Sequence, residues 1–287
     1  MENNLDILRQ KAEQGDPGAQ YRLGLIYECG EGVEPDYAAA AELYHSAARQ
    51  GHQTAQFDLD RIYRWAESLP DDNPAVERWG RQLAEEGNPR AQCSLGLSYE
   101  VKGNISEAIK WYLRAVDSGD KGAGYHLGML YMNGDGVEQD DNEAAKWFRI
   151  SAERGIADAQ CRLAFCYMTG RGVPHREEEA ARWYKYAAQK GNAAAQVNLG
   201  YLYAEGRGVP QDDVQAYAWY SVALHTKSNA AIESIKSIIP DFITDEDKAR
   251  EAAKNSREVL HNRMAVEQVV KAEELAMAWK NKISGKS

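Results

Sequence analysis

Cysteine is scarce in this chain of 287 residues, with only Cys29, Cys93, Cys161 and Cys166. Their spacing shows no pairing that would form a framework of disulfides. Three of them fall on expected helices, where a small apolar side chain fits. Cys161 and Cys166 are five residues apart, an angle of about 140° around a helix, so the two thiols cannot hold one metal ion. We therefore expect a reduced, cytoplasmic protein.

Long apolar runs are also missing. No stretch reaches the roughly 18 consecutive apolar residues that a membrane span needs. The start of the chain, Met-Glu-Asn-Asn-Leu-Asp-Ile-Leu, has neither the basic residues nor the apolar segment of a signal peptide. The sequence therefore predicts a protein that does not bind a membrane.

Basic residues are outnumbered by acidic ones, 34 to 44, which gives a formal net charge of -10. Residues 1–120 carry 21 acids and 12 bases, residues 121–224 carry 13 and 11, and residues 225–287 carry 10 and 11. The acidity therefore belongs to the N-terminal part. Nucleic-acid binding depends on clustered lysine and arginine, so the composition argues against a nucleic-acid partner.

The common motifs of enzyme chemistry are absent. The chain has no Gly-x-x-x-x-Gly-Lys-Ser/Thr loop, no His-Glu-x-x-His and no Gly-x-Ser-x-Gly. Its six histidines lack the spacing of metal ligands, and the inward-facing His126 is favoured as a plain groove residue over a catalytic base. The acids of 135–143 do not alternate as calcium ligands do. We predict no catalytic residues, no metal and no cofactor.

What the chain does contain is a repeat with a period of 36 residues. Four tryptophans share this spacing, at Trp111, Trp147, Trp183 and Trp219. A Leu-Gly-x-x-Tyr motif begins at Leu23, Leu95, Leu127 and Leu199, and a Gly-x-Gly-Val turn begins at Gly30, Gly134, Gly170 and Gly206. The repeats lie near 15–50, 51–86, 87–118, 119–154, 155–190 and 191–224.

Each repeat is expected to form two helices. Alanine, leucine and tyrosine four residues apart make a stripe on the first helix, and Gly200 removes a Cβ where the partner helix must come close. The glycine turn ends this helix because glycine tolerates a positive φ. Asp36, Asp140 and Asp212 suit the N-cap or first turn of the second helix. The tryptophans are expected in the core, and neighbouring hairpins must stack to bury their apolar faces.

The combined pattern closely resembles the Sel-1-like repeat, a relative of the tetratricopeptide repeat. It is Ala-Gln-x-x-Leu-Gly-x-x-Tyr-x-x-Gly-x-Gly-Val, then Ala-x-x-Trp-Tyr-x-x-Ala-Ala-x-x-Gly, and it covers residues 1–224. The resemblance implies an all-α fold, a right-handed superhelix of helix hairpins with helical caps. It also implies a bacterial scaffold or adaptor with a concave protein-binding surface.

Two repeats depart from this pattern. In 51–86, Asp60 stands where glycine is expected, and Leu-Pro-Asp-Asp-Asn-Pro at 69–74 replaces the glycine turn; repeat 87–118 is four residues short. This region is either a decayed part of the solenoid or the place where a partner sits. The sequence alone slightly favours decay, because loss of a motif needs no function.

Residues 225–287 are expected to form a C-terminal helical cap. A helix is predicted over 228–238, and a capping-box pattern at Thr244–Asp247 is followed by one long final helix. The apolar residues of that helix are near heptad spacing, but Arg263 and Glu273 interrupt the seam. Packing back on the solenoid is therefore favoured over a coiled-coil dimer, and we expect a monomer.

By analogy with the tetratricopeptide groove, two rows of residues on the first helices line the concave side. The first row precedes each motif leucine: Arg22, Asp58, Ser94, His126, Arg162 and Asn198. The second row lies two residues after it: Leu25, Arg61, Leu97, Met129, Phe165 and Tyr201. Polar groups beside apolar ones suit an extended or helical protein segment. The alternative, a solvated groove with binding on loops or edges, remains open.

Three functions fit these observations. The leading one is a non-enzymatic, regulatory adaptor that binds a segment of another protein in the concave groove. The second is a neutralising, immunity-type partner or a host-directed effector on the same scaffold. An enzyme or enzyme inhibitor is the least favoured, because it needs a polar constellation that the sequence does not show.

Overall fold

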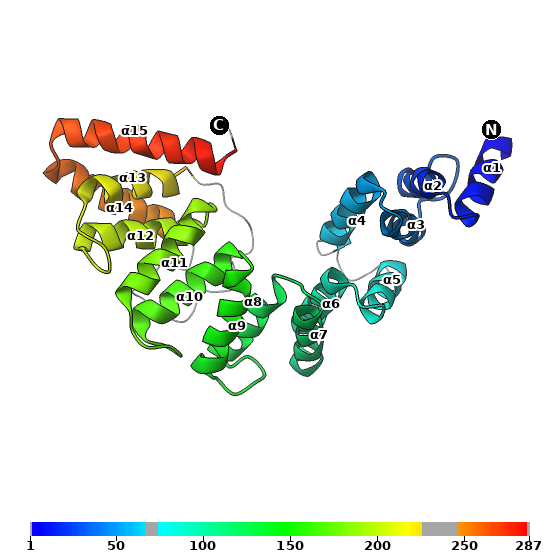
Figure 1. The fold of residues 1–287 in the computed structure, drawn as a ribbon, viewed down its shortest axis with the longest axis horizontal. Coiled ribbons are helices and arrows are strands. Elements are labelled where there is room, and N and C mark those ends of the chain that lie inside the picture. Colours follow the sequence, from blue (N-terminus) through cyan, green and yellow to red (C-terminus); the bar gives the residue numbers. More distant parts are fainter. Residues whose placement is uncertain (1, 67–73, 226–245, 286–287) are drawn as a thin grey trace. The chain divides into compact units, whose positions relative to one another are not determined.

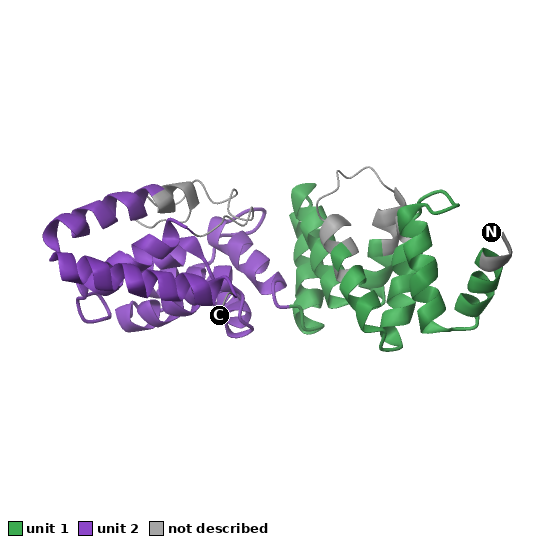
Figure 2. Cartoon of the chain, turned by 90° about the horizontal axis from the view of Figure 1, so that it is seen from above, with its two compact units in different colours: residues 1–120 green, residues 121–287 purple. Residues whose placement is uncertain are grey.

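The computed structural model of the chain describes residues 2–66, 74–225 and 246–285. Every regular element in these ranges is an α-helix (Figure 1). The chain divides into two compact units, unit 1 (Met1–Asp120) and unit 2 (Lys121–Ser287), which Figure 2 shows in different colours. Within each unit, most helices that follow one another in sequence pack against each other. The predicted all-α solenoid of helix hairpins is confirmed.

Unit 1 contains α1 to α7. Their bounds are α1 (Glu2–Glu13), α2 (Pro17–Cys29), α3 (Tyr37–Arg49), α4 (Gln53–Ala66), α5 (Pro74–Glu85), α6 (Pro89–Val101) and α7 (Ile105–Asp117). The α2–α3 and α6–α7 pairs are closely packed hairpins, and α1 covers α2. Most of the unusual turn at 69–74 lies outside the described residues.

Unit 2 contains α8 to α15. Their bounds are α8 (Ala123–Asn133), α9 (Asp141–Glu153), α10 (Ala157–Thr169), α11 (Glu177–Gln189), α12 (Ala193–Glu205), α13 (Asp213–Ala223), α14 (Glu246–Arg263) and α15 (Val266–Ile283). Three hairpins, α8–α9, α10–α11 and α12–α13, are followed by the α14–α15 pair, which packs on α13.

The two helices of a hairpin approach each other at the motif glycine. A Cβ added to Gly200 would lie 2.8 Å from the ring of Tyr220, and one added to Gly128 would lie 2.5 Å from the ring of Phe148. Such distances are too short for non-bonded carbon atoms, so the glycine is required by the close approach. The expectation for Gly200 is confirmed. Asp140 and Asp212 also cap the second helices as predicted, through bonds from backbone N–H groups.

The aromatic ring that packs against the first helix at this position belongs to the residue that follows the tryptophan position in the second helix. Tyr44, Tyr112, Phe148, Tyr184 and Tyr220 are each at most 2% exposed. Trp147 and Trp183, by contrast, are only partly buried, with Lys146 and Arg182 over their rings at 5.2 and 5.8 Å. The expectation that every tryptophan lies in the core is therefore wrong for these two. Neighbouring helical residues point about 100° apart, so only one of each pair can face the first helix.

The glycine turns also join one hairpin to the next. Gly208 has a φ of +67°, and a Cβ there would overlap the backbone of Glu177 at the start of α11. Arg207, between the two glycines of the turn, donates from Nε and a terminal nitrogen to the Glu177 carboxylate at 2.9 and 2.5 Å. One repeat earlier, Arg171 holds Asp141 at 3.0 and 2.6 Å. In both of these arginine clamps, the arginine follows its carboxylate partner by 30 residues in the chain.

The glutamine of the Ala-Gln motif makes a second link between hairpins. Its amide nitrogen donates to the carbonyl oxygen of the residue eight positions earlier, in the last turn of the preceding second helix. The four bonds are Gln20 to Ala12, Gln92 to Ala84, Gln160 to Ala152 and Gln196 to Ala188, all 3.0–3.1 Å. Helix ends carry carbonyl groups with no partner inside the helix, so each glutamine stabilises one of them.

The described part of the C-terminal segment contains two helices, α14 and α15, and the expectation of one long final helix is wrong. The chain turns at Met264 and Ala265, between α14 and α15. Arg263, the last residue of α14, donates to Asp213 at the start of α13 at 3.0 and 2.6 Å, which reproduces the arginine clamp of the glycine turns. Both α14 and α15 pack on α13, the second helix of the last repeat. The predicted helix over 228–238 lies outside the described residues.

The turn geometry predicts unequal effects for two glycine substitutions. Gly32 and Gly208 both have a positive φ, but a Cβ on Gly32 meets nothing within 4 Å. Gly32→Ala therefore carries only the backbone strain of about 1–2 kcal/mol, whereas Gly208→Ala adds a clash with α11. We expect Gly208→Ala to lower the free energy of unfolding by at least ~2 kcal/mol more. Chemical denaturation measures both, and equal losses would contradict the contact.

The buried tyrosine hydroxyls differ in their partners. The Tyr44 hydroxyl donates to Glu28 at 2.7 Å, and the Tyr112 hydroxyl donates to Glu100 at 2.5 Å. The Tyr184 hydroxyl is fully buried and has no hydrogen-bond partner in the described part of the chain. In its hairpin the position of Glu28 is taken by Met168. An unsatisfied buried hydroxyl is a cost that the fold carries.

This difference predicts opposite responses to loss of the hydroxyl. Tyr184→Phe should leave the free energy of unfolding unchanged or raise it by up to ~1 kcal/mol, because no bond is lost. Tyr112→Phe should lower it by roughly 1–2 kcal/mol, because a bond to a carboxylate is lost. Urea unfolding of the two variants tests this. A similar loss in both would mean that the Tyr184 hydroxyl has an acceptor in solution.

Candidate functional site

The ten residues predicted to contact a partner all lie on the first helices of hairpins. In unit 1, α2 carries Arg22, α4 carries Asp58 and Arg61, and α6 carries Ser94. In unit 2, α8 carries His126 and Met129, α10 carries Arg162 and Phe165, and α12 carries Asn198 and Tyr201. The two groups belong to different compact units, so each forms a separate candidate surface.

In unit 1, two of the predicted residues join a polar cluster. The Arg61 guanidinium lies 2.6 Å from Glu28 and 3.2 Å from Asp58. Tyr21 donates to the second oxygen of Asp58 at 2.9 Å, and Tyr44 donates to Glu28 at 2.7 Å. The cluster links α2 to α4, the first helices of two successive repeats. Sequence reasoning missed Glu28, although a buried tyrosine such as Tyr44 needs an acceptor nearby.

The cluster is negatively charged and partly open to solvent. The side chain of Arg61 is 43% exposed, while those of Glu28 and Asp58 are 14% exposed. Burial lowers the pKa of Arg61, but its hydrogen bonds to the two carboxylates raise it overall, so the guanidinium stays charged. Two carboxylates and one guanidinium leave a net charge of one negative unit.

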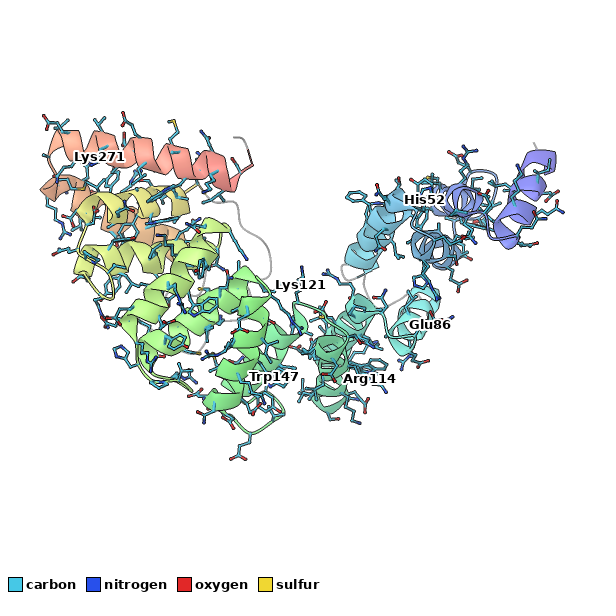
Figure 3. The ribbon with its side chains drawn as sticks, in the orientation of Figure 1. His52, Glu86, Arg114, Lys121, Trp147 and Lys271 are labelled. Carbon is cyan, nitrogen blue, oxygen red and sulfur yellow. The ribbon has the colours of Figure 1, made fainter. Side chains whose placement is uncertain are left out.

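His52 borders this cluster. His52 precedes α4 (Figure 3), where its Nδ1 accepts from the N–H of Ala55 at 3.2 Å and its ring stacks on Tyr21 with 4.6 Å between centroids. It therefore caps α4. Arg22 is exposed on α2, and Ser94 is half-buried on α6.

In unit 2, three predicted contact residues lie in the interior. Arg162 is 7% exposed, Phe165 4% and Asn198 6%. Arg162 lies near Tyr125 on α8. The pKa of Tyr125 is raised overall because the side chain is buried, and the nearby Arg162 opposes this rise. The repeat pattern places these residues on the expected helices, but it contains no information about what covers them.

The other predicted residues of unit 2 are more accessible. His126 and Met129 are half-buried on α8, and Tyr201 on α12 is 39% exposed. Tyr201 is thus the most open of the six. Unit 2 therefore presents fewer of its predicted contact residues to a partner than unit 1 does.

The thiols of α10 are not suited to nucleophilic chemistry. Cys161 and Cys166 are buried, and burial raises the pKa of each thiol to about 12, so both stay protonated at neutral pH. Within the described ranges, no three histidine, cysteine, aspartate or glutamate side chains gather to hold a metal ion. Among the described helices, none combines the length and apolar character needed to cross a membrane.

Comparison with known families identifies the repeat. The Sel1 repeat family matches residues 17–52, 89–120, 123–156, 157–192 and 193–224, which together make up more than half of the chain. Residues 53–88, which include α4 and α5, fall outside the matched segments. A comparison with curated proteins gives no match.

Two solved bacterial structures share the fold. A protective antigen present in uropathogenic Escherichia coli strains, which displays an SLR fold, is 29% identical with a TM-score of 0.68; the match covers 98% of this chain and 57% of the antigen. This chain therefore spans little more than half of the antigen's length. A Sel1 repeat protein from Oxalobacter formigenes is 35% identical with a TM-score of 0.58, over 74% of this chain and 89% of its own.

A third structure is more distant. An immunity protein from Pseudomonas aeruginosa is 20% identical with a TM-score of 0.40, over 86% of this chain and 82% of its own. A likeness at this level carries no argument about function.

The burial of the unit 2 residues predicts a stability effect at one of two matched aromatic positions. Phe165 and Tyr201 are 36 residues apart in the repeat, but only Phe165 is buried. Phe165→Ala should lower the free energy of unfolding by about 3–5 kcal/mol because it leaves a cavity. Tyr201→Ala should cost about 1 kcal/mol or less. Thermal and chemical unfolding test this; an unchanged melting point for Phe165→Ala would place its side chain at the surface.

Proposed function

Because this chain belongs to the Sel1 repeat family, we propose that it is a regulatory scaffold that binds a segment of a partner protein through the first helices of unit 1. The family is in general one of non-catalytic repeat scaffolds, and the fold supports a role in protein interaction. In this role the chain is a regulatory protein without catalytic activity. It acts as a monomer in the bacterial cytoplasm, as expected from the sequence.

The exposure of the predicted contact residues supports this choice of surface. Arg22 and Arg61 are exposed in unit 1, whereas Arg162, Phe165 and Asn198 in unit 2 are at most 7% exposed. A partner can reach the first group without any change in the fold. Polar side chains held in fixed orientations, such as Arg61 between two carboxylates, suit recognition of a polypeptide backbone and its charges.

Site-specific photo-crosslinking tests the proposal. A photoreactive residue at Arg22 samples the first-helix surface, and one at Lys110 samples the second helix α7 of the same unit, where the native side chain is 66% exposed. Crosslinking in native lysate, read by mass spectrometry, should join position 22 to a distinct protein that position 110 does not capture. Equal products at both positions, or none at position 22, would contradict binding through the first helices.

A further inference from the structure

Helix α4 presents an aromatic side chain at a position that other hairpins bury. Phe57 is 63% exposed. Its counterparts at the repeat spacing are all partly or fully buried: Tyr21, Cys93, Tyr125, Cys161 and Val197. A single exposed apolar residue is ordinary. This repeat differs from the others because its side chain at this position is a large ring that is exposed, whereas the equivalent side chains are partly or fully buried.

The exposed ring lies beside the polar cluster of unit 1. Phe57 and Arg61 are four residues apart on α4, so they project from the same helix face. Arg61 is fixed by Glu28 and Asp58 at 2.6 and 3.2 Å, and this group has a net charge of one negative unit. We call Phe57, Asp58 and Arg61 of α4, together with Glu28 of α2, the α4 face. It combines an open π surface with two carboxylates that are already oriented.

Unit 1 as a whole is also negatively charged, as the α4 face is. Residues 1–120 carry 21 acids and 12 bases, a net charge of -9, whereas residues 121–287 carry 23 acids and 22 bases, a net charge of -1. Nearly all of the net negative charge of the chain therefore belongs to unit 1, the unit that contains the α4 face. Such a field attracts cationic partners and repels phosphate groups, and a cation over an aromatic ring gains further attraction.

We propose that the α4 face is the docking site for a basic segment of a partner protein, with a lysine or arginine side chain over the ring of Phe57. This rests on the proposed function and gives the chemistry of its partner. Residues 53–88 lie outside the matched repeats. From the sequence alone, this region is either a decayed part of the solenoid or the place where a partner binds. An open ring beside oriented carboxylates favours a binding place.

A display library of short random peptides, selected on the full-length chain, tests the chemistry directly. Selected peptides should be rich in lysine and arginine, and added salt should weaken their binding because it screens exposed charges. Phe57→Ala should weaken the binding of the synthesised peptides about tenfold. Since Phe57 is largely exposed, this variant should fold normally. Leu113→Ala, at an exposed apolar residue of α7 that is 38% exposed, is the matched control and should bind as the native chain does.

Three results would overturn the proposal: selection of neutral or acidic peptides, an empty selection, or equal affinity of basic peptides for the native chain and Phe57→Ala. These results are separable from failure of the scaffold function. If position 22 still crosslinks a protein and Phe57→Ala captures the same protein equally well, the scaffold stands and the α4 face is not its basic-segment site. If crosslinking at position 22 also fails, both fall.

Discussion

The structure depends on one steric constraint, the close approach of the two helices in each hairpin. At Gly24, Gly96, Gly128 and Gly200 any Cβ would run into the ring of a tyrosine or phenylalanine on the second helix. Those rings are among the most buried side chains of the protein. The contact sets the spacing of the helices at these four glycines. Ala164 takes the same position in α10, and Asp60 takes it in α4, whose described residues do not pack closely on those of α5.

Polar links then join one hairpin to the next. The motif glutamines cap the carbonyl ends of preceding helices, and the turn arginines clamp carboxylates at the starts of second helices. The terminal helices α14 and α15 lack the repeat motif but keep the clamp through Arg263 and Asp213. Its packing is completed by Trp279 of α15, which stacks on Trp219 with 4.1 Å between ring centroids. Two helices of unrelated sequence thus end the solenoid by packing on α13.

The two units use their first helices differently. In unit 2, long stretches of α10 and α12 are buried throughout, so residues at groove positions contribute to the core. In unit 1, the corresponding helices keep charged and aromatic groups accessible, and this unit carries a net charge of -9. The repeat pattern alone does not assign the buried stretches or the open charged surface to particular repeats.

The sequence by itself determined the all-α helical repeat, the glycine contact at Gly200 and the N-caps Asp140 and Asp212, because each depends on residues close together in the chain or on the period. It also placed the ten candidate residues on the first helices. Only the tertiary structure decided that Arg162 and Phe165 are buried, that Glu28 completes the cluster around Arg61, and that the final segment turns at Ala265. Each of these depends on atoms brought together from distant parts of the chain, and a one-dimensional pattern contains no distances between them.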